Sequence, residues 1–234
     1  MQPKTIEYLS WDSEFFGFPI GKLTLDTRAE FEAWKAQFKP NREKLLYVFS
    51  NEPLAQGNDS FKFVDEKRTY SLQFGNEAEE SKIPEIRSLM DTRNFQAQLE
   101  TLTLRSGLYS RFKLDTLFPK GSFEKFYLTW LENSQKGLIA DELLAFMVAD
   151  EPAGFVTLAL KKDGVSIGLI AVDEQVSGKG IGKSLLQAAR QWAIQQGKSR
   201  IEVVTQGQNR IACRFYESAG YSLIQTQFVY HYWL

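Results

Sequence analysis

The stretch Gln175-Val-Ser-Gly-Lys-Gly-Ile-Gly-Lys-Ser184 holds three glycines at alternate positions. It follows an apolar, strand-like segment (165–172) and opens a helix-like segment (181–196). Glycine permits the left-handed backbone of a tight turn, and the free N–H groups at the start of a helix attract an anion. The stretch therefore predicts a phosphate-binding loop between a strand and a helix, with a ligand-free glycine turn as the alternative.

Three phosphate-binding patterns compete for this loop. The Walker pattern fits Gly182-Lys183-Ser184, but Ser177 stands where its leading glycine belongs. The Rossmann pattern begins at Gly178 and Gly180, but a lysine occupies the place of its third glycine. The pattern Gln/Arg-x-x-Gly-x-Gly/Ala is met in full, beginning at Gln175. In this the loop resembles the acetyl-CoA pyrophosphate loop of the GNAT family of N-acetyltransferases.

Composition excludes several classes of function. The chain of 234 residues carries 28 Lys and Arg against 29 Asp and Glu, so it has no electrostatic footprint for nucleic acid or an anionic membrane. Its start, Met1-Gln-Pro-Lys4, lacks an apolar signal core, and no run approaches membrane-spanning length. We expect a soluble cytoplasmic protein that binds neither nucleic acid nor membrane.

The chain has one cysteine, Cys213, and one histidine, His231. One cysteine forms no internal disulfide, and a zinc site needs more ligands of these kinds. A histidine-based triad would have a single available base. We therefore expect no metal, a core position for Cys213, and a packed or surface position for His231.

The polar segment 75–82 predicts a domain boundary that divides the chain into residues 1–78 and 79–234. The first part is expected to be a small α/β domain, either on the acceptor side of the site or a structural extension. Its pattern predicts a strand at 19–25, an amphipathic helix at 26–38, a buried strand at 45–49, and one or two strands at 61–74.

The second part alternates differently. We predict helices at 83–95 and around 123–134, then antiparallel strands at 142–149, 153–161 and 165–172, the loop, a helix at 181–196, a strand at 200–205, a helix at 209–218, and a final hairpin at 221–234. This is the order of the GNAT core. The resemblance implies an α/β (α+β) fold with a mixed, largely antiparallel sheet, and residues 79–234 as the acetyltransferase domain.

A second motif runs from Asn209 to Tyr221 and resembles the GNAT signature Asn-x-x-Ala-x-x-x-Tyr-x-x-x-Gly-Phe/Tyr. Asn209 and Tyr216 are seven residues apart, so a helix places them on one face, and Ala212 between them leaves room for a chain lying across it. The resemblance assigns Asn209 to the amides of the cofactor and Tyr216 to protonating the leaving sulfur. A phenol suits that role because it is still protonated at neutral pH.

The resemblance also implies the rest of the acetyl-CoA site. The loop would hold the pyrophosphate through its backbone N–H groups, with added charge from two lysines, and the end of the preceding strand would pair with pantetheine. The residues expected to bind the cofactor are Leu169, Ile170, Ala171, Val172, Gln175, Gly178, Lys179, Gly180, Ile181, Gly182, Lys183, Ser184, Asn209 and Ala212. Transfer is expected to be direct, because no credible Cys–His nucleophile pair exists. No base stands out, and Asp115 and Glu142 are candidate ends of a water chain.

Four further stretches, 11–20, 109–115, 126–130 and 230–234, resemble GNAT enzymes that acetylate the 4-amino group of a dTDP-linked amino-dideoxy sugar. This implies a small-molecule acceptor, with Arg111 on the diphosphate, Tyr109 or Phe112 against thymine, and Asp115 among the substrate-binding residues. Alternatives are another small amine or a protein N-terminus as acceptor, a non-catalytic CoA-binding module, and a P-loop NTPase. The sequence is also compatible with a homodimer.

Overall fold

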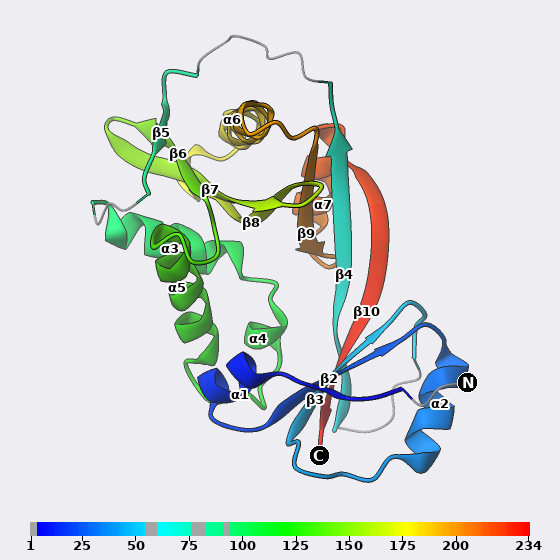
Figure 1. Ribbon diagram of the computed structural model, residues 1–234. Coiled ribbons are helices and arrows are strands. Elements are labelled where there is room, and N and C mark those ends of the chain that lie inside the picture. Colours follow the sequence, from blue (N-terminus) through cyan, green and yellow to red (C-terminus); the bar gives the residue numbers. More distant parts are fainter. Residues whose placement is uncertain (1–3, 55–59, 76–82, 91–93) are drawn as a thin grey trace.

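The computed structural model describes residues 4–54, 60–75, 83–90 and 94–234. Within these ranges the strands form one mixed sheet in the order β1-β2-β3-β10-β4-β9-β8-β7-β6-β5 (Figure 1). Only the pairs β2–β3 and β8–β9 are parallel. The predicted mixed, largely antiparallel sheet is therefore confirmed.

The N-terminal part contains a short edge strand and two helices that alternate with buried strands. Its elements are β1 (Glu7–Tyr8), α1 (Ser10–Phe16), β2 (Ile20–Leu25), α2 (Arg28–Gln37), β3 (Leu45–Ser50) and β4 (Phe61–Gln73). The strands and the helix predicted for this part are confirmed, and the segment 61–74 forms one strand rather than two.

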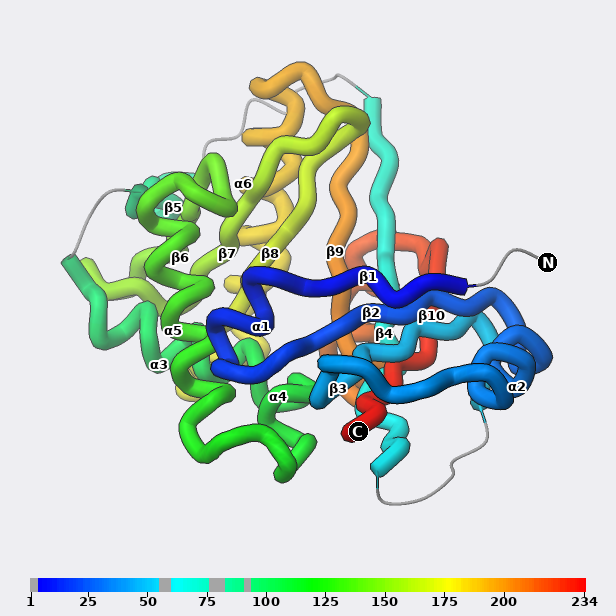
Figure 2. The backbone as a smooth tube through the Cα atoms, turned by 60° about the horizontal axis from the view of Figure 1, so that its bottom comes forward, coloured from blue at the N-terminus to red at the C-terminus, as the bar shows by residue number. Residues whose placement is uncertain are grey.

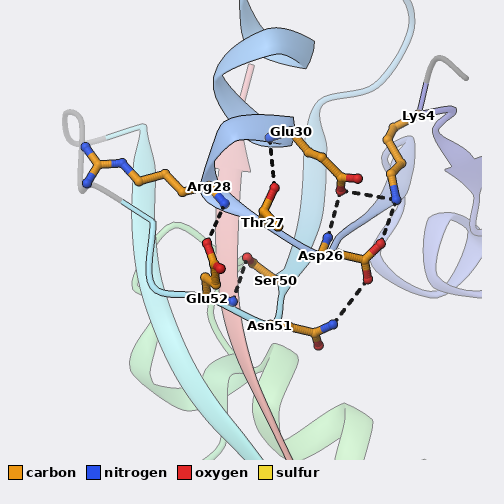
Figure 3. A network of polar contacts seen from close by, with 8 residues as sticks. All are labelled: Lys4, Asp26, Thr27, Arg28, Glu30, Ser50, Asn51 and Glu52. Atoms are coloured by element: carbon orange, nitrogen blue, oxygen red, sulfur yellow. Dashed lines mark hydrogen bonds and ion pairs between the residues drawn. The ribbon is translucent and has the colours of Figure 1, made fainter. Parts of the chain in front are cut away.

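A polar network fixes the start of α2 (Figure 3). Thr27 caps the helix by accepting from Glu30 N at 3.2 Å, and the Glu30 carboxylate accepts in turn from Asp26 N at 2.8 Å. Lys4 Nζ pairs with the carboxylates of Asp26 and Glu30 at 3.1 and 3.2 Å. The reciprocal cap satisfies backbone donors that an uncapped helix would leave free. It holds the start of α2 against the ends of β2 and β3.

The remaining elements build the larger part of the molecule. They are β5 (Ile86–Ser88), α3 (Gln96–Ser106), α4 (Arg111–Leu114), α5 (Ser122–Gln135), β6 (Glu142–Val148), β7 (Glu151–Lys161), β8 (Gly164–Val172), η1 (Glu174–Val176), α6 (Ile181–Gln195), β9 (Arg200–Gln206), α7 (Arg210–Ser218) and β10 (Ser222–Trp233). From β6 to α7 the predicted order of strands, loop and helices is confirmed.

Two predicted elements are wrong. The helix expected at 83–95 is instead a short strand, β5, which pairs antiparallel with β6, so tertiary pairing overrides local preference; the helix of this region, α3, begins at Gln96. The hairpin expected at 221–234 is one long strand, β10, which pairs with β3 on one side and β4 on the other. Residues 222–234 contain no glycine, proline or asparagine, so nothing in them favours a tight turn.

The predicted boundary between residues 78 and 79 lies outside the described residues. The strands on either side of it belong to the same sheet: β4 pairs along Lys67–Gln73 with β9 and along most of its length with β10. The division into two domains stays a prediction.

Helices cover both faces of the sheet in two separate regions (Figures 1 and 2). Over β6–β9, α6 and α7 pack on one face and α3 and α5 on the other, each pair with its own apolar cluster. Over β2, β3 and β10, α2 packs on one face, and the other is filled by aromatic side chains that also involve α1 and α4. The face beneath α6 and α7 is called the α7 face below, and the face carrying α3, α4 and α5 the α4 face.

Candidate active site

The parallel pair β8–β9 separates soon after it forms. Pairing is limited to Val165–Ile167 of β8 against Ile201–Val203 of β9. Beyond this point β8 continues along β7 to Val172, while β9 continues along β4 to Gln206. From Gly168 onward one edge of β8 therefore has no strand partner among the described residues. An edge of this kind offers free backbone donors and acceptors to an extended ligand.

The free N–H groups on this edge can be assigned from the strand's alternation. Leu169 N donates to Thr157 Oγ1 and Asp173 N donates to Ala153 O, both at 2.8 Å and both toward β7. Because successive N–H groups of a strand point to opposite edges, those of Ile170 and Val172 face the gap toward β9. The strand end 169–172 is thus an unpaired edge with two N–H donors that face the gap between β8 and β9.

The glycine loop presents a run of free backbone amides. The φ angles of Gly178 and Gly180 are 81° and 86°, values that other L-residues rarely adopt. Within the described part of the chain, no backbone acceptor is found for the N–H groups of residues 178–183, whereas Ser184 N already bonds Gly180 O at 3.0 Å. Gly180 is the N-cap of α6 and provides no side-chain cap. Loop and helix dipole together form an anion-binding cradle.

The side chains of the loop lie mainly in solvent. Gln175, Lys179 and Lys183 are exposed, and the lysines are free to add positive charge above the amides. Ile181 is buried in the cluster beneath α6 and anchors the start of the helix. Ser184 Oγ lies 3.4 Å from Gly180 O and closes the first turn.

α7 joins the loop and the strand edge. A Cβ on Gly182 would lie 3.0 Å from the Phe215 ring and 3.8 Å from a Val172 methyl group, so α6, α7 and the end of β8 meet at this glycine. Asn209 is the N-cap of α7, and its side-chain oxygen accepts from Ala212 N at 3.1 Å. The cap leaves the amide nitrogen of Asn209 for a ligand, and Ala212 half-buried beside it.

Tyr216 is buried inside this junction. Its ring lies 5.8 Å from that of Tyr70 and 5.9 Å from that of Tyr221, and burial raises the pKa of its phenol well above the ordinary value. No hydrogen bond of the Tyr216 hydroxyl is found to any described residue. A phenol in this environment stays protonated at any physiological pH, as a proton donor must.

The predicted substrate residues occupy α4 and the turn before it. Tyr109 is partly exposed. The Arg111 guanidinium carbon lies 4.5 Å above the Tyr47 ring and 4.8 Å above the Phe112 ring. Arg111 Nε is buried and has no hydrogen-bond partner within the described ranges. A half-buried guanidinium with an unused donor is suited to a ligand.

Asp115 lies next to Arg111 in the fold but is closed off by protein. Asp115 Oδ2 accepts from His231 Nδ1 at 2.6 Å and from Trp233 Nε1 at 2.9 Å. Burial opposes ionisation, but these two bonds outweigh it and keep the pKa of Asp115 below its usual value. Asp115 therefore holds α4 to β10, and its influence on a substrate would pass through Arg111. The other candidate end of a water chain, Glu142, accepts from Ser88 Oγ at 2.6 Å.

One titratable residue that the sequence analysis missed is Asp65 on β4. It is 7% exposed, and its Oδ1 is buried with no partner in the described part of the chain. Burial raises the pKa of Asp65 to about 7, against the opposing charge of Arg111. A carboxyl that titrates near neutrality is poised to exchange a proton. The sequence offered little signal, because Asp65 is the first of four consecutive charged residues, 65–68, within the predicted strand region.

The sheet separates Asp65 from Tyr216. From Asp65 onward the side chains of β4 alternate regularly: Arg68 and Tyr70 reach α7, where they contact Cys213 (3.9 Å) and Glu217 (2.9 Å). The odd-numbered Asp65 and Lys67 point to the α4 face, where Lys67 and Arg111 both lie over the Phe49 ring. The two candidate proton-transfer groups thus lie on opposite faces of the sheet.

Other site classes find no support in the described part of the molecule. No group of three or more His, Cys, Asp or Glu side chains is arranged there to hold a metal ion. No helix in these ranges has the length and apolar character that crossing a membrane requires. Cys213 is buried as expected, and so is His231.

Comparisons with known proteins agree with this geometry. The sequence model of the Acetyltransferase (GNAT) family matches residues 107–221. The chain is 28% identical to dTDP-fucosamine acetyltransferase of Escherichia coli O6:H1 over 241 residues, covering 98% of this chain and 97% of that protein.

Two solved structures are similar in fold. A GCN5-related N-acetyltransferase from Kribbella flavida matches with a TM-score of 0.51 at 11% identity, covering 91% of this chain and 80% of that one. A functionally unknown conserved protein from Staphylococcus epidermidis matches with a TM-score of 0.59 at 15% identity, covering 99% and 92%. At these identities the likeness concerns the fold, and it confirms the fold class expected from the sequence.

Proposed function

We propose that this protein, an acetyltransferase that carries a GNAT-family domain at residues 107–221, moves the acetyl group of acetyl-CoA onto the 4-amino group of a dTDP-linked amino-dideoxy sugar. One observation carries the proposal: the free edge of β8 leads directly into a loop of free amides at the start of α6. The edge and the loop together suit the two chemically different parts of coenzyme A, an amide-bearing arm and a diphosphate.

The donor is bound mainly by backbone. Amides of residues 178–183 receive the diphosphate, and the pantetheine arm lies along 169–172 like an added strand. The N–H groups of Ile170 and Val172 point toward it, and one of them would face the thioester oxygen. Asn209 donates its free amide nitrogen to the arm, and Ala212 leaves space for it.

The chemical step uses both faces of the sheet. The amine nitrogen attacks the thioester carbonyl carbon from the α4 face, and the C–S bond breaks as the sulfur departs on the α7 face. Asp65, in its ionised form, is the final acceptor of the proton that the amine loses, which reaches it through intervening water. Tyr216 gives its phenolic proton to the departing thiolate, so the products are an N-acetyl amide and free CoA. The acceptor and the cofactor thereby approach from opposite sides of one gap.

The choice of acceptor is supported by a relative. The alignment with this chain covers 97% of the Escherichia coli protein, which is a dTDP-fucosamine acetyltransferase. Arg111 with its unused Nε, and Tyr109 at the surface, provide polar and aromatic contacts on the acceptor side. A GNAT enzyme acting on another small amine or a protein N-terminus is the second candidate.

The test is release of CoA from acetyl-CoA, followed with a thiol reagent, against a panel of amines. We expect turnover with dTDP-4-amino-4,6-dideoxygalactose and a far lower kcat/KM with a polyamine, an aminoglycoside or a peptide N-terminus. Calorimetry should show acetyl-CoA binding in the absence of any acceptor. Binding without turnover of any amine would favour a non-catalytic CoA-binding module, and no binding at all would refute the proposed function.

A further inference from the structure

A cavity of about 240 Å³ lies on the α4 face against the second half of α5. Its wall includes apolar Ile139 and Ala159, and its polar groups come from Trp130, Lys161 and Ser166. Sites for whole ligands of drug size have volumes of roughly 300–1,000 Å³. This cavity therefore suits a single ring rather than a complete sugar nucleotide.

Gly168, where β8 parts from β9, is one of the residues that line the cavity. A Cβ at this position would lie 2.9 Å from Thr157 Oγ1 and 3.5 Å from Trp130 Nε1. Thr157 Oγ1 cannot give way cheaply, because it accepts from Leu169 N at 2.8 Å. Glycine thus leaves bare backbone between the cavity and the strand edge that receives the thioester arm. A group at the Gly168 end of the cavity would lie beside the strand edge that is proposed to receive the thioester arm.

The polar groups around the cavity are unused by the protein. Within the described residues, Trp130 Nε1 and Ser166 Oγ have no hydrogen bond and Lys161 Nζ has no ion pair. The Trp130 ring lies 5.8 and 5.9 Å from the rings of Phe126 and Tyr127. Trp130, Ser166 and Lys161 are half-exposed or exposed, so their donors are available to a polar ligand that enters the cavity.

Arg111 is differently placed. Its guanidinium is held against the rings of Tyr47 and Phe112, and its positive charge acts on the carboxyls of buried Asp65 and half-buried Asp12. A cation that already interacts with nearby carboxyl groups binds an anionic ligand less strongly than an ammonium group without such partners. Lys161 at the far end of the cavity is exposed and unpaired among the described side chains.

We propose that the cavity is the subsite for the pyranose ring of the acceptor, with the amine toward Gly168 and the anomeric phosphate toward Lys161. This rests on the proposed function and deepens it. Lys161 pairs with Gly164, four residues before Gly168, so the two ends are separated by about 13 Å of strand. That length matches a pyranose ring with a substituent at each end plus part of a lysine side chain. C1 and C4 lie on opposite sides of the ring, so its phosphate and amine point in opposite directions, as the cavity requires.

The test compares two acceptors: the dTDP-linked amino sugar, and the same amino sugar as a methyl glycoside without the diphosphate. Lys161→Ala should raise the KM of the nucleotide-linked acceptor roughly tenfold and leave the KM of the glycoside and of acetyl-CoA unchanged. Lys162→Ala is the matched control: it removes the next lysine of the same hairpin, whose backbone oxygen accepts from Lys198 Nζ, and should change neither KM. Trp130→Ala should raise the KM of both acceptors.

The assignment is overturned if Arg111→Ala, and not Lys161→Ala, weakens the nucleotide-linked acceptor selectively. It is also overturned if Trp130→Ala leaves both acceptors unaffected while the variant binds acetyl-CoA normally, which would mean a water-filled hollow. Failure of the proposed function has another signature, since no amine would then release CoA. Calorimetry with the intact dTDP-sugar, on the wild type and Lys161→Ala, would still decide the subsite: equal affinities refute it.

Discussion

Burial decides which titratable side chains of this site can donate or accept a proton at neutral pH. The phenol of Tyr216 is kept protonated by the apolar junction of α6, α7 and β4, whereas the carboxyl of Asp65 has its pKa raised to about 7. The same physical cause, loss of solvent around the charged form, thus makes one group a permanent donor and the other a switchable acceptor.

Replacing Tyr216 by phenylalanine should lower kcat roughly tenfold or more while the Kd for acetyl-CoA stays the same. Only the hydroxyl is lost, and the ring contacts with Tyr70 and Tyr221 remain. Tyr221→Phe is the matched control: it removes the hydroxyl of a second buried tyrosine 5.9 Å away, one that has no hydrogen-bond partner among the described residues. Steady-state kinetics and calorimetry on both variants provide the measurement. Equal losses would remove Tyr216 from the acid role.

Asp65→Asn should abolish most of the activity and, in contrast, stabilise the fold above neutral pH. Because the pKa of the folded carboxyl is raised from 3.8 to about 7, the folded state favours the proton, and stability is lost as the pH rises through this interval. In the wild type, kcat/KM should accordingly rise with pH and level off above about 7. The free energy of unfolding of the variant at pH 8 should be higher by about 1–3 kcal/mol.

Glu66→Gln is the control for Asp65, since Glu66 sits one residue on, points to the other face and pairs with Arg68 at 2.6 Å. It should keep the pH profile of the wild type. If Asp65→Asn kept the pH dependence of kcat/KM near neutrality, a group other than Asp65 would be responsible for it.

At the scale of elements, the decisive arrangement is strand, loop and helix in direct succession. β8 ends with backbone N–H groups that face the gap toward β9, and the loop adds further unpaired N–H groups. α6 then contributes the positive end of its dipole. Sequence reasoning found this unit because it is local: every residue in it lies between 164 and 195. The partner of the unit, α7, was also found from its motif, although its packing on Gly182 was not.

Gly180→Ala should raise the KM for acetyl-CoA roughly tenfold. An alanine at φ 86° is strained by about 1 kcal/mol, and its methyl group would point into the open space in front of the loop. Gly197→Ala tests strain alone, because Gly197 follows the other end of α6 with φ 68° and equally open surroundings. It should lose similar stability in chemical unfolding and keep the KM. A raised KM in both variants would assign the effect to distortion of α6.

A second element-level device clamps α4 to β10. His231 is fully buried, and burial lowers its pKa to about 4 despite the opposing hydrogen bond to Asp115. It is therefore neutral at physiological pH and donates from Nδ1. Through Asp115, whose N–H also bonds Arg111 O at 3.0 Å, the clamp fixes the short helix that carries Arg111.

The clamp predicts an acid-sensitive contribution to stability. A histidine whose pKa falls on folding contributes fully above its unfolded value of 6.5, and this is lost as the pH drops toward 4. His231→Asn keeps a donor for Asp115. As the pH drops over this interval, its free energy of unfolding should fall by about 1–3 kcal/mol less than that of the wild type. Urea titrations at several pH values measure the difference. Asp65 acts in the opposite direction, so only the comparison of variant with wild type isolates His231; parallel curves would contradict the prediction.

On the scale of the whole molecule, the single sheet ties the two predicted domains together. β4 comes from the first part of the chain, yet it lies between β10 and β9 of the second. The proposed proton acceptor, Asp65, is on this shared strand, so the proposed site would be incomplete without the N-terminal unit. The predicted homodimer stays a prediction, for light scattering to test.

Residues 79–234 expressed alone should not fold, because β9 and β10 would each lose the strand between them. Co-expression with residues 1–78 should restore a soluble, acetyl-CoA-binding complex by returning β4 to its place. Near-ultraviolet circular dichroism and calorimetry are suitable measurements. Cooperative unfolding and cofactor binding by the isolated fragment 79–234 would instead establish an independent domain.

The sequence by itself determined what is local: the glycine loop, the strand and helix around it, the motif of α7 with its asparagine and tyrosine, and the family they resemble. Short-range periodicity and special backbone conformations leave marks within a few residues. Only the tertiary structure decided that β4 bridges both parts, that 222–233 is one strand, and that Asp65 titrates near neutrality while Asp115 is closed off. These depend on burial and pairing between residues more than a hundred positions apart, and such contacts leave no periodicity in the chain to detect.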